Sequence, residues 1–240
     1  MMENAIAWIF IFPLFGAVAC ALVGMRQSKL CYPISGLSML GATWAGAETL
    51  MQAVQSPVHE VSYILGGWTL DAFPRGVGIE FRADLLGALI TLVVLGVGLI
   101  VSLYSKLPVR EETPGKEPLF YVLFLLQITG LAGICLTGDA FNLYVLIEVA
   151  ALTGYGLIAM GTNRAAAATF NYLILGTIGA SLYLLGVGYL YIKTGTLNMV
   201  GVQEVIQANG LMDSPSMQVA FALIGLGILI KMAFFPFHAW

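Results

Sequence analysis

The sequence predicts an all-α integral membrane protein with about seven transmembrane helices, the seventh of them discontinuous. Three observations carry this prediction. Of the 240 residues, 59% are hydrophobic and only 10% are charged, whereas soluble domains carry about 25% charged residues. The apolar residues gather in runs of about 20, the length that crosses a hydrocarbon core about 30 Å thick. The last run contains Pro236, which removes a backbone donor and interrupts a helix.

The predicted spans are separated by short polar segments. We expect Ala5–Gly24 to be a retained first span rather than a signal peptide, because Glu3 precedes it and no basic region does. The seventh span begins near Met217 and is expected to break at Pro236. The spans between them are 31–54, 84–104, 119–136, 139–160 and 165–192.

The segments between the spans differ in character. Segment 55–83 is polar and contains Pro57, Pro74 and several glycines. Its alternation of apolar and polar residues at 77–82 predicts a short surface hairpin rather than a span. Segments 105–118 and 193–216 are expected to be loops.

Lysine and arginine residues predict the orientation of the chain. With an external N-terminus, the inner loops hold six of them and the outer loops three. Cytoplasmic loops are normally richer in Lys and Arg, so we expect a multi-pass protein of the cell membrane, in a prokaryotic inner membrane, with its N-terminus outside. The net charge of -3 and the lack of a basic run argue against nucleic-acid binding. The inner residues are Arg26, Lys29, Lys106, Arg110, Lys116 and Arg164, and the outer ones are Arg75, Arg82 and Lys193.

Glu148 is a carboxylate placed deep in the fifth predicted span. It lies about 13 Å from the start of that span, too far for a glutamate side chain to reach water. A charge at this depth costs at least about 2.5 to 3.5 kcal/mol, so it normally faces a protein interior or a hydrated path. Tyr144 and Tyr155 share its helical face. Glu148 is therefore either a proton-binding group or a carboxyl that joins helices through hydroxyl groups.

Lys231 is the candidate partner of Glu148. It lies in the seventh apolar run, five residues before Pro236. A broken membrane helix leaves backbone carbonyls and helix ends beside a hydrated site, which is typical of ion sites in transporters. Burial disfavours the charged form of a lysine and a nearby carboxylate favours it. A Glu/Lys pair whose separation changes would therefore be a switchable proton site. The alternative is a lysine that extends to the membrane interface.

The remaining reactive residues give weaker indications. His238 could pass protons onward, because an imidazole titrates near neutral pH, or it could be structural. Asp139 is expected to cap the fifth span. The three cysteines lack metal-binding spacing and are expected to pack as small hydrophobic residues. The sequence therefore predicts no metal site and no cofactor. The cysteines are Cys20, Cys31 and Cys135.

Four stretches are distinctive: 84–89 (Asp-Leu-Leu-Gly-Ala-Leu), 138–148 (Gly-Asp-Ala-Phe-Asn-Leu-Tyr-Val-Leu-Ile-Glu), 194–198 (Thr-Gly-Thr-Leu-Asn) and 231–240 (Lys-Met-Ala-Phe-Phe-Pro-Phe-His-Ala-Trp). Together they resemble the large antiporter-like subunits of multisubunit Mrp-type Na⁺/H⁺ antiporters, of the membrane arm of respiratory complex I and of related hydrogenases. The D-type subunit of the Mrp antiporters is the member that the chain resembles most.

This resemblance implies roles for three residues. Glu148 matches the essential glutamate of the fifth helix, Lys231 the essential lysine of the discontinuous seventh helix, and His238 the motif histidine after the break. In such subunits the pair is thought to gate proton transfer along a polar axis at mid-membrane. Many relatives have a lysine near the position of Asn171, which is uncharged here.

The resemblance also implies a domain organisation. Residues 1–117 would form helices 1 to 3 with the long outer loop 55–83, and residues 118–240 would form helices 4 to 7, an incomplete first repeat of an inverted-repeat fold. Relatives usually carry a second repeat, whereas this chain stops inside its seventh span. An open broken helix in lipid would leave backbone groups unsatisfied. We therefore expect partner membrane subunits, including a chain or segment that supplies the eighth helix onward.

Three functions remain open at this stage. The first is a proton-translocating subunit of a cation/proton antiporter or redox-driven pump, with Na⁺ as a candidate second ion. The second is a structural membrane subunit without transport of its own, which the uncharged Asn171 favours. The third is a standalone secondary transporter, which the mainly Phe and Met residues around the break disfavour. In each case the chain is expected not to be an enzyme, and any redox chemistry belongs to other chains.

Overall fold

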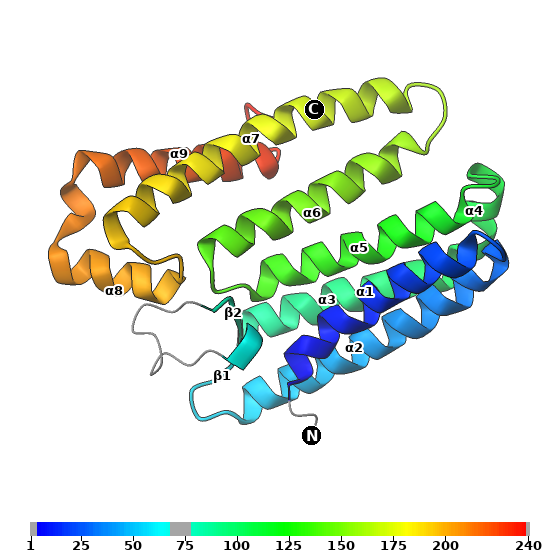
Figure 1. Ribbon diagram of the computed structural model, residues 1–240, viewed down its shortest axis with the longest axis horizontal. Helices are drawn as coiled ribbons and strands as arrows, with labels where there is room; N and C mark the ends of the chain where they lie inside the picture. The colour runs from blue at the N-terminus through cyan, green and yellow to red at the C-terminus, as the bar shows by residue number, and fades with distance from the viewer. Residues whose placement is uncertain (1–3, 68–77, 239–240) are drawn as a thin grey trace.

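The computed structural model describes residues 4–67 and 78–238. Its long helices lie side by side along one axis (Figure 1). The short helices α4 (Lys106–Glu112) and α8 (Met199–Asn209) lie at opposite ends of this bundle. The long helices are α1 (Ala5–Gly24), α2 (Cys31–Gln55), α3 (Leu85–Tyr104), α5 (Glu117–Leu136), α6 (Ala140–Ala159), α7 (Ala165–Thr194) and α9 (Pro215–Lys231), and 3₁₀ turns occur at Ser28–Leu30, Leu65–Gly67 and Leu211–Asp213.

The long helices coincide with the seven spans predicted from the sequence. In the described part of the chain, α1, α3, α5, α6 and α7 are long and apolar enough to cross a membrane. Helix α2 has 25 residues but includes serine, threonine, glutamate and glutamine, and α9 is apolar but has only 17 residues. The chain is therefore an all-α membrane protein.

Two segments predicted as loops, 105–118 and 193–216, contain the helices α4 and α8. Helix α8 begins after Asn198, whose side-chain oxygen accepts hydrogen bonds from the backbone N–H groups of Val200 and Gly201 at 3.0 Å. It ends at Gly210, which has a left-handed φ of 59°. These are ordinary helix-capping devices. The loop prediction was wrong here because such short, polar helices carry no membrane-span signal.

The polar segment after α2 contains the hairpin that its alternating pattern predicts. Strand β1 (Glu60–Ile64) pairs antiparallel with β2 (Glu80–Asp84), and Ser62 lies opposite Arg82. The predicted connection between the strands falls on residues 68–77, which lie outside the described residues. The hairpin lies at the same end of the bundle as α8 (Figure 1).

Helices α1, α2, α3 and α5 enclose the larger hydrophobic core. Ile9, Met39, Leu95 and Leu125 are fully buried in it. Helix α5 also packs against α6, which in turn packs against α7. The order of packing therefore places α6 between the N-terminal core and the α7–α9 pair.

Helix α9 lies directly on α7 because glycines remove side chains from their contact. A Cβ atom added at Gly227 would come within 2.6 Å of the Gly179 carbonyl oxygen and 2.8 Å of the Tyr183 backbone nitrogen. Small residues allow this close approach in lipid. The contact sets the position of Lys231, which lies one helical turn beyond Gly227.

Candidate functional site

Helix α6 carries Glu148 and is fixed at its start. Asp139 is its N-cap, as predicted: Oδ1 accepts a hydrogen bond from the Asn142 backbone N–H at 2.7 Å. The Asn142 side chain donates a second hydrogen bond to Thr137 Oγ1 at 2.9 Å. Glu148 is the ninth residue of this helix, about 12 Å along the axis from Ala140. It therefore lies near the middle of a membrane-spanning helix.

Helix α9 ends at Lys231, not at Pro236 as predicted. The backbone N–H groups of Ala233 and Phe234 donate to carbonyls of the last turn at 3.2 and 3.0 Å, and Ala233 has a left-handed φ of 52°. This pairing is a Schellman motif. Proline restricts mainly the residue before it. Pro236 therefore gave no signal that the helix ends five residues earlier, at Lys231.

Lys231 and Glu148 form an ion pair. Lys231 Nζ donates a hydrogen bond to Glu148 Oε1 at 2.8 Å. The two side chains are 13% and 19% exposed, so most of their surface is shielded. Lys231 lies in the last turn of α9, where the helix end favours a cation. The fold thus brings together two charges that are 83 residues apart in the sequence.

A cleft of about 370 Å³ reaches the Lys231 side chain. It is lined by residues of α5, α6, α7 and α9, and its polar lining residues besides Lys231 are Gln127 and Tyr172. Gln127 Oε1 accepts a hydrogen bond from Thr153 Oγ1 at 2.7 Å. The cleft leaves open space beside the Lys231 side chain.

The two tyrosines on the Glu148 face have different surroundings. Tyr155 is 4% exposed, and its ring packs edge-on against Tyr172 with centroids 4.5 Å apart. Tyr144 is half-buried, with its ring 6.0 Å from that of Phe141. Within the described residues, Glu148 receives its hydrogen bond from Lys231 and from neither tyrosine. The sequence places both tyrosines on the helical face of Glu148, but in the described part of the chain neither hydroxyl bonds directly to its carboxylate.

His238 and Asn171 are both exposed. The ring of His238 stacks on that of Phe235 at 5.5 Å, and Asn171 lies on the exposed side of α7. Among the residues that the structure describes, neither contacts the Glu148–Lys231 pair.

A junction that the sequence did not predict joins the hairpin to the starts of α6 and α8. Asn198 Nδ2 donates to Glu80 Oε2 at 2.5 Å. The backbone N–H of Gly138 donates to the Glu80 carbonyl at 2.9 Å, and that of Met199 donates to the Gly138 carbonyl at 2.9 Å. These bonds fix the start of α6 and hence the depth of Glu148. Asn198 was visible as a capping residue, but its contact with Glu80, 118 positions away, had no sequence signal.

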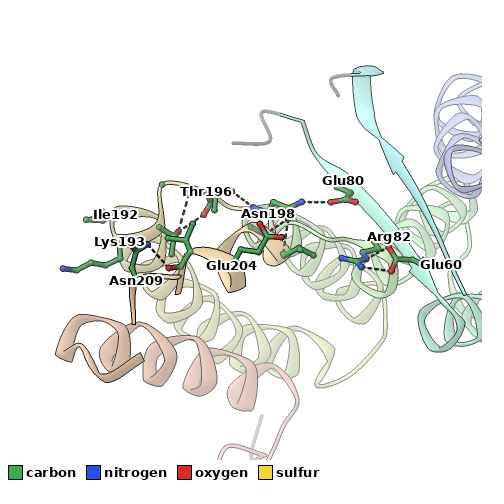
Figure 2. Close-up of a pocket in the computed structure, with 14 residues that line it drawn as sticks. Glu60, Glu80, Arg82, Ile192, Lys193, Thr196, Asn198, Glu204 and Asn209 are labelled. Carbon is green, nitrogen blue, oxygen red and sulfur yellow. Dashed lines mark hydrogen bonds and ion pairs between the residues drawn. The ribbon is translucent and has the colours of Figure 1, made fainter. Parts of the chain in front are cut away.

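A surface cleft of about 670 Å³ lies beside this junction (Figure 2). In it, Arg82 forms an ion pair with Glu60, and Nη2 donates to Oε2 at 2.6 Å. This hydrogen bond raises the pKa of the Arg82 guanidinium, because the carboxylate stabilises its charged form. The exposed residues Lys193 and Glu204 also line the cleft. This cleft lies at the hairpin end of the bundle, and neither Glu148 nor Lys231 lines it.

Within the described residues, no three His, Cys, Asp or Glu side chains are grouped to hold a metal ion. Cys20 and Cys31 are buried, and each thiol lies 3.6 Å from the other residue's carbonyl oxygen. Cys135 is half-buried. These thiols pack between helices, as small hydrophobic residues do.

Comparison with known proteins agrees with this architecture. Residues 137–240 match the family described as NADH:quinone oxidoreductase/Mrp antiporter, transmembrane. The N-type subunit of the NADH-quinone oxidoreductase of Desulforudis audaxviator is 41% identical over 237 residues, which are 97% of this chain and 45% of that relative. The D-type subunit of the Na⁺/H⁺ antiporter of Bacillus subtilis is 32% identical over 246 residues, covering 100% of this chain and 46% of that relative.

The fold itself also has a solved counterpart. A chain of the membrane-bound sulfane sulfur reductase, an archaeal respiratory membrane complex, superposes with a TM-score of 0.84 at 29% identity, over 98% of this chain and 46% of that chain. The chain thus spans less than half the length of these relatives. By sequence and by fold, it belongs to the antiporter-like membrane subunits of Mrp antiporters and NADH:quinone oxidoreductases.

Proposed function

We propose that the chain is a proton-translocating antiporter-like subunit of a multisubunit cation/proton antiporter or redox-driven pump, and that Glu148 and Lys231 carry the proton. The observation that supports this most is their 2.8 Å ion pair, which joins the middle of α6 to the end of α9. Ionisable groups at such depth are costly and normally mark ion or proton pathways. The family of the chain supports the same class of function.

In this proposal the separation of the two side chains controls the proton. Against Glu148 the Lys231 ammonium is stabilised by the carboxylate. When it moves away, burial disfavours both charged forms, so the amine releases a proton and the carboxyl takes one up. His238, beyond the end of α9, is proposed to pass protons to or from Lys231.

Replacement of either charge tests the proposal. In membranes that contain the assembled complex, we expect Glu148→Gln and Lys231→Ala to slow proton transport about 100-fold or more, the scale of acid–base catalysis. Assembly should persist. Glu204→Gln, an exposed carboxylate on α8, is the matched control and should transport normally. Unchanged transport in Glu148→Gln would instead favour a structural membrane subunit.

We further propose that other membrane subunits complete the transport path, with Na⁺ as a candidate exchanged ion. The chain spans under half the length of its relatives, and Phe234 and Phe235 beyond α9 are 57% and 75% exposed. A helix from another segment or chain would cover such residues. Proteoliposomes with this chain alone are therefore expected to show no proton transport, in contrast to the complex.

We propose a cell-membrane location with the N-terminus outside. The α1–α2 connection, α4 with the α4–α5 connection, and the α6–α7 connection share one end of the bundle (Figure 1) and carry the six basic residues assigned to the inside. In a background without the native cysteines, Gln207→Cys on α8 should react with an impermeant maleimide added to intact cells. Gln27→Cys should react only after the membrane is opened. The reverse pattern would refute this orientation.

A further inference from the structure

The hydroxyl group of Tyr155 is buried and, among the described residues, has no hydrogen-bond partner. Tyr155 lies on α6 seven positions after Glu148 and therefore on the same face. Its ring is held edge-on by Tyr172, at an interplanar angle of 87°. A buried hydroxyl without a partner is destabilising, because it has given up its hydrogen bonds to water without replacing them. This cost disappears in any state of the site in which a hydrogen-bond partner reaches the Tyr155 hydroxyl.

Tyr183 shows how a tyrosine that only joins helices is arranged in this protein. It is 4% exposed, like Tyr155. Its hydroxyl donates a hydrogen bond to the Ala140 carbonyl at 3.0 Å, across the α6–α7 contact. Tyr155 lies at the same contact but has no such partner within the described residues. A purely structural role explains the hydroxyl of Tyr183 and not that of Tyr155.

Gly176 on α7 provides the space into which the Tyr155 hydroxyl projects. A Cβ atom added at Gly176 would overlap that hydroxyl. The same point lies 3.7 Å from Lys231 Nζ. The hydroxyl and the ammonium therefore border one small space, which only a glycine at position 176 leaves open.

We propose that Tyr155 is a positioning residue that accepts a hydrogen bond from Lys231 when the ammonium leaves Glu148. This inference rests on the proposed function. A short movement of the flexible lysine side chain into the space beside Gly176 brings Nζ to the hydroxyl. A neutral hydroxyl holds an ammonium less tightly than a carboxylate does. Lys231 at Tyr155 is thus kept in place but releases its proton more readily than in the ion pair.

The first test removes the hydroxyl alone. In the assembled complex, Tyr155→Phe is expected to slow proton transport about ten-fold or more, the effect of losing a hydrogen bond to a charged group. Tyr189→Phe removes a hydroxyl from an exposed tyrosine of α7 and should leave the rate unchanged. A normal rate in Tyr155→Phe would overturn the proposal.

The second test returns a hydroxyl from the facing helix. In the Tyr155→Phe background, Gly176→Ser places a hydroxyl beside Lys231, whereas Gly176→Ala fills the same space without one. The added Cβ lies 3.1 Å from the ring carbon Cζ, so the ring must shift by a few tenths of an ångström in both variants. We expect the serine variant to recover most of the rate and the alanine variant not to. Equal rates in the two double variants would overturn the proposal, even if Tyr155→Phe assembles poorly.

These outcomes are separate from those that test the proposed function. If Glu148→Gln abolishes transport while Tyr155→Phe transports normally, the ion pair carries the proton and Tyr155 does not position Lys231. If Glu148→Gln transports normally, the proposed function fails, whatever the Tyr155 variants show.

Discussion

Lys231→Ala is expected to lower the free energy of unfolding by about 3 to 5 kcal/mol, because it leaves the Glu148 carboxylate shielded and unpaired. Glu148→Gln is expected to be destabilising for the converse reason, since it strands the ammonium. The double variant Lys231→Ala/Glu148→Gln has no charge left to desolvate and should be more stable than either single variant. Thermal or denaturant unfolding of the complex in nanodiscs measures these differences.

The two single variants and the double variant form a double-mutant cycle for the Glu148–Lys231 pair. Lys193→Ala removes an exposed lysine and is the control. Strict additivity of the two single variants would show that the pair in the structure has no energetic coupling.

Gly227→Ala is expected to separate α9 from α7 and to displace Lys231. The added Cβ would meet backbone atoms of Gly179 and Tyr183 at 2.6 and 2.8 Å, and backbone atoms cannot rotate away as a side chain can. Overpacking in a well-packed core typically costs about 1 to 3 kcal/mol. Because Lys231 follows one turn later on the same helix, proton transport should fall together with stability. Unfolding and transport of the same preparation provide the measurement.

Gly225→Ala is the matched control for Gly227→Ala. It lies in the same helix, two residues earlier, and a Cβ there would meet nothing within 4 Å. Alanine is favoured over glycine in a helix by up to about 1 kcal/mol, so this variant should be as stable as the parent or more so. Equal losses in the two variants would show that helix propensity, and not the α7–α9 contact, decides the outcome.

The spans and the two buried charges could be predicted because their signals are local. Apolar length against bilayer thickness identified the seven helices, and the insertion cost of a charge singled out Glu148 and indicated Lys231 as its candidate partner. The hairpin followed from its alternating pattern, and the cap at Asp139 from residue type. These features depend only on neighbours in the sequence.

Other features escaped prediction because they depend on distant contacts or compete with nearby signals. The end of α9 was assigned to Pro236, but the left-handed turn at Ala233 closes the helix first. Helix α8 has its own caps. A prediction that searches only for membrane spans nevertheless assigns the segment between two spans to a loop. The bond between Asn198 and Glu80 joins segments whose distance in the sequence carries no pairing signal.

The sequence by itself determined that the chain lies in a membrane and that Glu148 and Lys231 each need a polar neighbour there, since hydrocarbon penalises a charge whatever its surroundings become. Only the tertiary structure decided that the two predicted partners lie close enough to form an ion pair. Glycine contacts bring α9 against α7, and this close packing puts Lys231 at the depth of Glu148 and leaves the Tyr155 hydroxyl facing the same space. Packing geometry of this kind is a property of several helices at once, so no single stretch of sequence contains it.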